Sequence, residues 1–507
     1  KAELQDMIPI ALTENARDLT KQRKFDEAIE VQQKLVSEFG RQRKDMASKA
    51  LFNIGVIHES ARRFPQAVAA YEQVIKKYPK EDVAVQAQFD IGSLYESQTE
   101  FVKAAQAFIQ MERFKTHDKA SDAIRNAGLI YEAMEQYRQA HDTFERYLKT
   151  FKDKDDVKKV AFHSADVLQR SGEVKDLTAS AKAFEKIAKK HGKKDQQYRL
   201  RAIVSAALAY KKADKVKNRR KVEKLLGDAL KIWAKLDPTA PPVPGSKAAL
   251  RLENQMKAAA RAIAAGKKPK PIKKKKATGP TEEIKPSTKA YAANGALELA
   301  EYAYDDYAVL TIEAVRKKGP RKGTFDVGLL KKTLVAKAEA LQAAEKSFTF
   351  VLSFKDPGMN AAGAFRGGLL MYEFAESLFD APVPPELTNE EDIDEYRFQL
   401  EEVAAPIQEK SLKRFTQALK QALDKNVYNK WSRLSATYAA KVNPDEFPIS
   451  DFEGKANKTK DTLSSTSFIK LVRRGAEVVD FTQSREEAKE EAAKKASDAQ
   501  GDKKETK

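Results

Sequence analysis

A pattern that recurs three times within the first 150 residues constrains this chain more than any other feature. Each copy has a glycine, an aromatic or histidine residue three positions later, then an alanine, and an aromatic residue four positions after that alanine. The copies begin at Gly55, Gly92 and Gly128, which are 37 and 36 residues apart. A repeat of this length is the size of one supersecondary unit, and stacked copies of such units form solenoids.

The spacing within each copy predicts a pair of antiparallel helices. The glycine allows close approach of the second helix, and the alanine occupies the point where the two helices cross. The aromatic residue one turn beyond the alanine fills the remaining space on the same face. Pro79 ends the second helix of the first full copy, because proline cannot continue the backbone hydrogen bonds. Each pair leaves an apolar face uncovered, so neighbouring pairs are expected to stack.

These positions resemble the tetratricopeptide repeat (TPR) family. This sequence departs from the family pattern at His58, at Ala127, and at Thr116 and Lys152, where proline would close a repeat. The stretch from Tyr71 to Gly92 is similar to TPR proteins of the Gram-negative cell envelope. The layout of the whole chain is similar, more than its motifs are, to myxobacterial gliding-machinery TPR lipoproteins.

The pattern weakens along the chain and divides it into four parts. We expect an all-α fold that begins with a TPR α-solenoid at residues 1–236, with about six helical hairpins of which the last two are degenerate. A linker rich in proline and lysine, with one helix, follows at 237–287. Residues 288–450 again carry apolar positions at helical spacing and predict a diverged, TPR-like helical domain. Residues 451–507 are expected to form a polar, partly disordered tail.

The positive charge of the chain is concentrated in two zones. The sequence has 93 Lys and Arg residues against 74 Asp and Glu residues, a formal net charge of +19. Residues 186–221 hold 14 basic residues and two acidic ones, and residues 267–276 hold seven lysines and no acid. Either zone could attract nucleic acid, an acidic protein, or an anionic lipid or cell-wall polymer. Alternatively, the first zone is a solvated helix surface and the second is a flexible connector.

Sequence signatures of catalysis are missing. The chain has no Cys, which excludes thiol nucleophiles, disulfides and zinc-thiolate sites. The five histidines form no HExxH pair, and neither a GxxxxGK[ST] loop nor a GxSxG elbow occurs. The cluster of Gly358, Gly363, Gly367 and Gly368 is interpreted as helix packing. We therefore predict no catalytic residues, no metal site and no cofactor.

The sequence also gives an expectation about the cellular compartment of the protein. No run of about 18 uncharged apolar residues occurs, so no transmembrane helix is predicted. The chain begins at Lys1 without a signal pattern, so we expect a processed or trimmed product whose targeting or anchoring segment would precede Lys1. The resemblance implies the periplasm or cell envelope, with the cytoplasm as the alternative.

The resemblance implies a binding surface on the first helix of each repeat, where TPR proteins hold a segment of a partner protein. Carried onto this sequence, the family register predicts these partner-binding residues: Lys49, Phe52, Asn53, Phe89, Asp90, Arg125 and Asn126. An Asn at the position of Asn53 and Asn126 suits an extended peptide, because its amide both donates and accepts. The alternatives are that the phenylalanines belong to the core and that the polar residues face solvent without a partner.

The sequence thus predicts a non-enzymatic scaffold for other proteins, in an envelope-spanning complex such as a motility or outer-membrane machinery. The alternative is a nucleic-acid-associated TPR protein that binds phosphates through its basic zones, with an affinity that falls steeply as salt increases.

Overall fold

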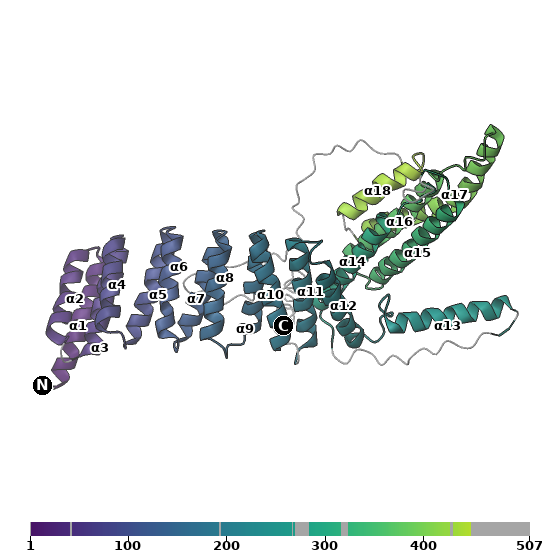
Figure 1. The fold of residues 1–507 in the computed structure, drawn as a ribbon. Helices are drawn as coiled ribbons and strands as arrows, with labels where there is room; N and C mark the ends of the chain where they lie inside the picture. The colour runs from purple at the N-terminus through teal and green to yellow at the C-terminus, as the bar shows by residue number, and fades with distance from the viewer. Residues whose placement is uncertain are drawn as a thin grey trace, which may run out of the picture. The chain divides into compact units, whose positions relative to one another are not determined.

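The computed structural model describes residues 2–40, 43–191, 194–265, 267–268, 283–315, 323–425 and 429–447. Within these ranges the regular elements are helices, apart from one isolated antiparallel bridge between Val315 and Phe325 (Figure 1). The predicted all-α fold is confirmed. The predicted tail at 451–507 and most of the lysine-rich stretch at 267–276 lie outside the described residues. Across the described ranges, we find no helix with the length and apolarity needed for a membrane span.

The chain forms two compact units, and the division falls between Ser180 and Ala181, within one helix. The boundaries predicted from the sequence, after residues 236, 287 and 450, stay a prediction.

The first unit is a succession of antiparallel helix pairs. From α1 to α9 each helix packs against the next, and α1, α3, α5 and α7 also contact one another in sequence, so the first helices of the pairs form a layer. This is the stacking that the repeat predicted. The helices are α1 (Ala2–Lys21), α2 (Phe25–Phe39), α3 (Lys44–Ser60), α4 (Phe64–Lys77), α5 (Asp82–Ser97), α6 (Phe101–Ile109) with the 3₁₀ helix η1 (Gln110–Phe114), α7 (Asp118–Ala133), α8 (Tyr137–Thr150), α9 (Val157–Arg170) and α10 (Val174–His191), which crosses the division.

The repeated alanines and glycines lie at the close helix contacts that their spacing predicted. Ala67, Ala104 and Ala140 are fully buried where the paired helices cross. A Cβ atom added to the glycine of any copy would lie less than 3.0 Å from the aromatic ring of the same pair. These glycine–ring contacts are Gly55 with Tyr71, Gly92 with Phe108, and Gly128 with Phe144.

The turns within the pairs share one backbone conformation. A residue with positive φ follows the first helix in five successive pairs, and only the fifth is glycine: Arg23 (62°), Arg62 (58°), Thr99 (61°), Glu135 (59°) and Gly172 (72°). In the first four of these turns the next N–H bonds to a carbonyl five residues back, as in Arg63 N–H to His58 O at 2.8 Å. This arrangement satisfies carbonyls at the helix end that would otherwise lack a donor.

The second unit is also built of packed helices. α11 and α12 pack on each other and on α14, and each helix from α14 to α18 packs on the next. Its helices are α11 (Gln196–Ala213), α12 (Arg219–Leu236), α13 (Lys247–Ala264), α14 (Pro286–Ala308), α15 (Val327–Leu352), α16 (Pro357–Phe379), α17 (Glu390–Asp424) and α18 (Lys430–Val442).

A glycine–ring contact also occurs in the second unit. A Cβ on Gly368 of α16 would lie 2.7 Å from the ring of Phe415 on α17. Ser411, four residues before Phe415, is fully buried, so a small residue stands where the repeats have alanine. Gly363 is also closely packed, but an added Cβ on Gly367 would meet nothing within 4 Å. Helix packing therefore explains some of the predicted glycine cluster but not Gly367.

Candidate partner-binding face

The predicted partner-binding residues lie on α3, α5 and α7 of the first unit. We call the side of α3, α5 and α7 that carries these positions the first-helix face. The three helices differ strongly in how much of this face is open.

The residues on α3 are the most accessible. Lys49 is exposed, and Phe52 and Asn53 are half-buried. The Phe52 ring lies 5.2 Å from the ring of Tyr71, between centroids. Phe52 therefore packs on the hairpin core and still keeps part of its surface accessible. Its position fits both interpretations from the sequence, a core residue and a partner-binding residue.

On α5, Phe89 is half-buried and its ring lies 5.4 Å from that of Phe108. Asp90 is only 1% exposed and accepts a hydrogen bond from Gln86 Nε2 at 2.7 Å. Lys119 of α7 bonds to Gln86 and lies with its Nζ 5.8 Å from the Phe89 ring centroid. These contacts connect α5 to α7 along the face.

On α7 the predicted residues lie in the interior. Arg125 is 5% exposed and forms ion pairs of 2.7 Å with Asp122 and with Asp156, which precedes α9. Asn126 is 1% exposed. The structure therefore leaves Lys49, Phe52, Asn53 and Phe89 as the accessible candidates, whereas Asp90, Arg125 and Asn126 are buried. Partner binding by any of the seven residues stays a prediction.

A buried charged group joins α7 and α9. The Glu132 side chain is 2% exposed and lies 2.7 Å from His163 Nε2 and 2.6 Å from Arg170. Glu132 and His163 are 31 residues apart in the sequence and lie on different helices. The repeat spacing alone therefore does not predict this pairing.

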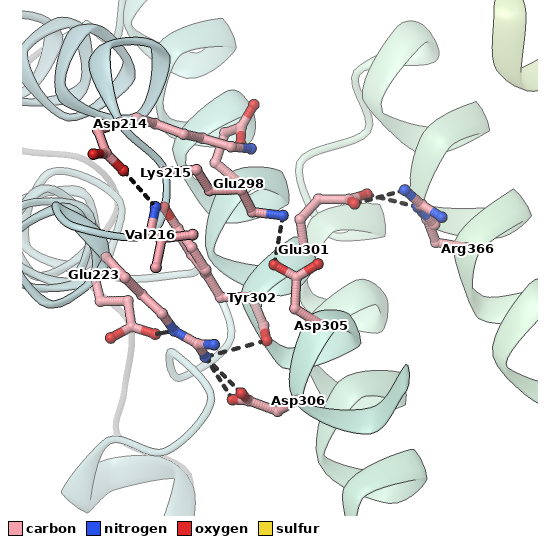
Figure 2. A network of polar contacts seen from close by, with 12 residues as sticks. Asp214, Lys215, Val216, Glu223, Glu298, Glu301, Tyr302, Asp305, Asp306 and Arg366 are labelled. Carbon is pink, nitrogen blue, oxygen red and sulfur yellow. Dashed lines mark hydrogen bonds and ion pairs between the residues drawn. The ribbon is translucent and has the colours of Figure 1, made fainter. Parts of the chain in front are cut away.

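Part of the first basic zone is paired with acidic residues of the same chain. In the second unit, α14 brings its acidic side chains against the end of α11 and the start of α12 (Figure 2). Lys215 Nζ lies 2.6 Å from Asp305, and Arg219 lies 2.7 Å from Asp306. Lys211 forms an ion pair with Glu298.

Tyr302 lies at the centre of this network. The cationic groups of Lys211, Lys215 and Arg219 lie 5.1–5.9 Å from its ring centroid. Burial, and secondarily Glu298, raises the pKa of Tyr302 to about 12. Cations over an aromatic face are stabilised by the negative charge of the ring surface. Zone 186–221 thus uses several of its cations for internal packing of helices.

A second polar group connects α14 to α16. Arg366 forms a bidentate ion pair with Glu301 at 2.8 and 2.7 Å (Figure 2). The Tyr304 hydroxyl donates to Glu373 at 2.7 Å. Burial raises the pKa of Glu373, although Tyr304, Arg366 and Lys337 act in the opposite direction.

In the ranges that the structure covers, no three His, Asp or Glu side chains gather in a way that could hold a metal ion. A surface hollow of about 630 Å³ in the first unit is lined by Glu112, Arg113, Lys115, Lys149, Thr150, Lys152 and Asp153. Glu112 in this hollow already accepts from Thr150 Oγ1 at 3.1 Å.

A family model for the tetratricopeptide repeat matches residues 13–82 and again residues 52–115. Residues 13–115 of the chain carry tetratricopeptide repeats. The matched stretch extends from α1 to the start of the turn before α7, and the pair α7–α8 beyond it has the same glycine–ring contact.

No curated protein matches the chain. Among solved structures, a TPR protein from Parabacteroides merdae is 13% identical, with 65% of this chain and 99% of that chain covered and a TM-score of 0.23. The structure of Naa15/Naa10 bound to HypK-THB is 15% identical, with 87% of this chain and 64% of that chain covered and a TM-score of 0.27. The APC/C hetero-tetramer Cut9–Hcn1 is 11% identical, with 87% of this chain and 96% of that chain covered and a TM-score of 0.25. At these values, the three structures carry no argument about what this chain binds.

Proposed function

We propose that this TPR protein is a non-enzymatic scaffold that binds a partner protein on the first-helix face, at the part formed by α3 and α5. The observation that carries the proposal is the adjacency of four accessible residues on two helices in contact: Lys49, Phe52, Asn53 and Phe89. Partly open aromatic rings provide contact area, and the lysine and asparagine beside them provide directional hydrogen bonds.

The packing of the two rings supports this choice. Phe52 and Phe89 pack with tilted rings against Tyr71 and Phe108, which are almost fully buried. Their positions are therefore fixed before a partner arrives, so little side-chain freedom is lost on binding. Rigid aromatic side chains of this kind are the usual anchors of protein interfaces.

The test is a photo-crosslinkable amino acid placed at Lys49 or at Asn53, with Lys76 on the exposed side of α4 as the matched control. We expect both positions on α3 to crosslink the same protein, and Lys76 not to. Phe89→Ala should then weaken binding of the purified partner by about 1–2 kcal/mol. Crosslinking at all three positions alike would contradict a specific face.

The experiment also separates the scaffold from the nucleic-acid alternative. A protein bound to the first-helix face is retained after nuclease treatment and at high salt. Partners held through phosphate contacts are lost under both conditions. Internal pairing of Lys211, Lys215 and Arg219 favours the scaffold, because these cations already have acidic neighbours.

We further propose that the scaffold works in the cell envelope, within a motility or outer-membrane machinery. Its support is the similarity of residues 71–92 to envelope TPR proteins. Fractionation of the source cells tests this location: recovery of the chain in the periplasmic or membrane fraction is expected, and recovery in the cytoplasm alone would contradict it.

A further inference from the structure

Helix α13 differs from the other described helices of the second unit because none of its 18 residues is buried. Ser246 caps its start and accepts a hydrogen bond from Ala249 N at 3.2 Å. Its contact with α15 includes an ion pair of 2.8 Å between Glu253 and Lys346. A helix without a buried face gains little from tertiary packing, so its pattern of side chains calls for another explanation.

That pattern is an apolar stripe opposite a basic face. The stripe has alternating three- and four-residue spacing and consists of Ala249, Leu252, Met256, Ala259 and Ile263. Met256 is 56% exposed and Ile263 is 64% exposed. Lys247, Arg251, Lys257 and Arg261 lie on the other side at about 100° per residue. Lys267 and Lys268 follow the helix and are exposed.

We propose that α13 binds an anionic lipid surface, with its apolar stripe inserted at the headgroup–acyl boundary and its basic face toward the headgroups. Between Lys247 and Lys268 the chain has six basic residues and one acidic residue, Glu253. A helix with an apolar stripe and a lysine- and arginine-rich polar face has the composition that lies in the plane of a membrane interface. The positive charge of this helix complements anionic headgroups.

The stripe itself favours lipid over a protein groove. Two of its five positions are alanine, and it has no aromatic side chain. Helices that bind in protein grooves usually rely on large anchors at each turn, which α13 lacks. A bilayer interface requires apolar area but no shape complementarity. The absence of aromatic residues between Lys247 and Lys268 also disfavours stacking on the bases of single-stranded nucleic acid.

The chain offers a direct test, because it has no Cys and a single introduced cysteine is a unique attachment site. An environment-sensitive fluorophore would be attached in full-length Ile263→Cys and, as the matched control, in Asn254→Cys. The two positions are nine residues apart and therefore lie on opposite sides of a helix with about 3.6 residues per turn. With vesicles of three parts phosphatidylcholine to one part phosphatidylglycerol, we expect the label at 263 to brighten and shift to shorter wavelength, and the label at 254 to change little.

Binding strength provides the second readout. Neutralising two cations by Arg251→Gln with Arg261→Gln should weaken vesicle binding roughly 25-fold, about five-fold for each cation. The charge-matched control, Lys80→Gln with Lys182→Gln, should change it less than about two-fold. Met256→Ser with Ile263→Ser should weaken binding by about ten-fold or more, because each side chain loses its transfer from water. The melting temperature of these variants should match the parent, since none of the substituted residues is buried.

Several results would overturn the proposal. Equal binding to phosphatidylcholine alone would exclude recognition of anionic lipid. If the fluorescence of the label at 263 changes with protein concentration when no vesicles are present, the apolar stripe contacts a second copy of the chain. Binding unaffected by either α13 double substitution would place the membrane contact elsewhere. Because α13 and the first-helix face belong to different units, failure of one proposal leaves the other testable.

Discussion

The ring of Tyr71 occupies the space that a Cβ atom on Gly55 would need. Tyr71 is fully buried, and its hydroxyl donates to Glu59 at 3.1 Å, so the ring is held at both ends. The same contact recurs at Gly92 with Phe108 and at Gly128 with Phe144. The distance between the helices of each pair is therefore set by a glycine on one helix and an aromatic ring on the other.

Gly92→Ala should destabilise the first unit by about 1–3 kcal/mol, because the added methyl group must displace the buried Phe108 ring. Gly227→Ala is the control, since an added Cβ in the middle of α12 meets nothing within 4 Å. That change should stabilise the chain by about 0.5–1 kcal/mol through helix propensity. Urea unfolding followed by circular dichroism measures both, and a loss of stability in Gly227→Ala equal to that in Gly92→Ala would contradict this account.

Thr99→Gly should raise the stability of the first unit by up to about 1 kcal/mol. Thr99 has φ of 61°, a left-handed conformation that is costly for a β-branched residue. Relief of this strain outweighs the entropy that glycine adds to the unfolded chain. The reverse change, Gly172→Ala at φ 72°, should lower stability, although an added Cβ would have open space there. Opposite shifts in the thermal midpoint are expected, and shifts of the same sign would refute the prediction.

Glu132→Gln should lower the free energy of unfolding by about 3–5 kcal/mol. The change removes the buried negative charge that lies beside His163 and Arg170. Glu100→Gln is the matched control: Glu100 pairs with Lys103 at 3.0 Å, but both side chains are about half exposed. That change should alter stability by less than about 1 kcal/mol. If chemical unfolding gives equal effects for the two changes, Glu132 does not contribute to the α7–α9 contact as described.

Arg219→Glu should loosen the contact of α14 with α12, and Asp306→Arg in the same chain should restore part of the loss. The pair is 2.7 Å apart and partly exposed, so we expect a coupling energy of about 1 kcal/mol that decreases at high salt. A double-mutant cycle on the thermal unfolding of the full chain measures the coupling. Strict additivity of the two single changes would show that the ion pair does not stabilise the contact.

Glu373→Gln should make the second unit more stable at neutral pH and should change its pH dependence. Burial raises the pKa of Glu373 above its usual value of 4.5, so the folded chain holds this proton more tightly than the unfolded chain. The contribution of Glu373 to stability is therefore largest at low pH and is lost as pH rises through the folded pKa. Tyr304 can still donate to the glutamine oxygen. In urea unfolding between pH 4 and pH 8, the free energy of unfolding of the variant should increase relative to that of the parent as pH rises. A difference that stays constant with pH would contradict the raised pKa of Glu373.

The local architecture followed from the sequence because the repeat is a property of neighbouring residues. The spacing of Gly55, Ala67 and Tyr71 is sufficient to define a hairpin, since residues one turn apart share a helix face. Recurrence of the same spacing 36 and 37 residues later predicted the stacking. The break after Lys77, before Pro79, followed from the missing N–H of proline.

Accessibility at the candidate site did not follow from the sequence. The family register placed Asn53, Asp90 and Asn126 in one column, but Asn53 is half-buried and the other two are 1% exposed. The difference depends on the side chains around each residue, such as Gln86, which lies one turn before Asp90 on the same helix. The repeat pattern alone does not specify these neighbours.

The sequence by itself determined the helical pairs, their order and their tendency to stack, because these depend on short-range spacing and on apolar faces that must be covered. Only the tertiary structure decided which charges are available. Lys215 and Arg219 appeared as members of a basic zone, and they lie against Asp305 and Asp306, which are 90 and 87 residues away along the chain. Charge in a sequence is a sum over residues, but the field that a partner meets depends on the distances between them, and folding sets those distances.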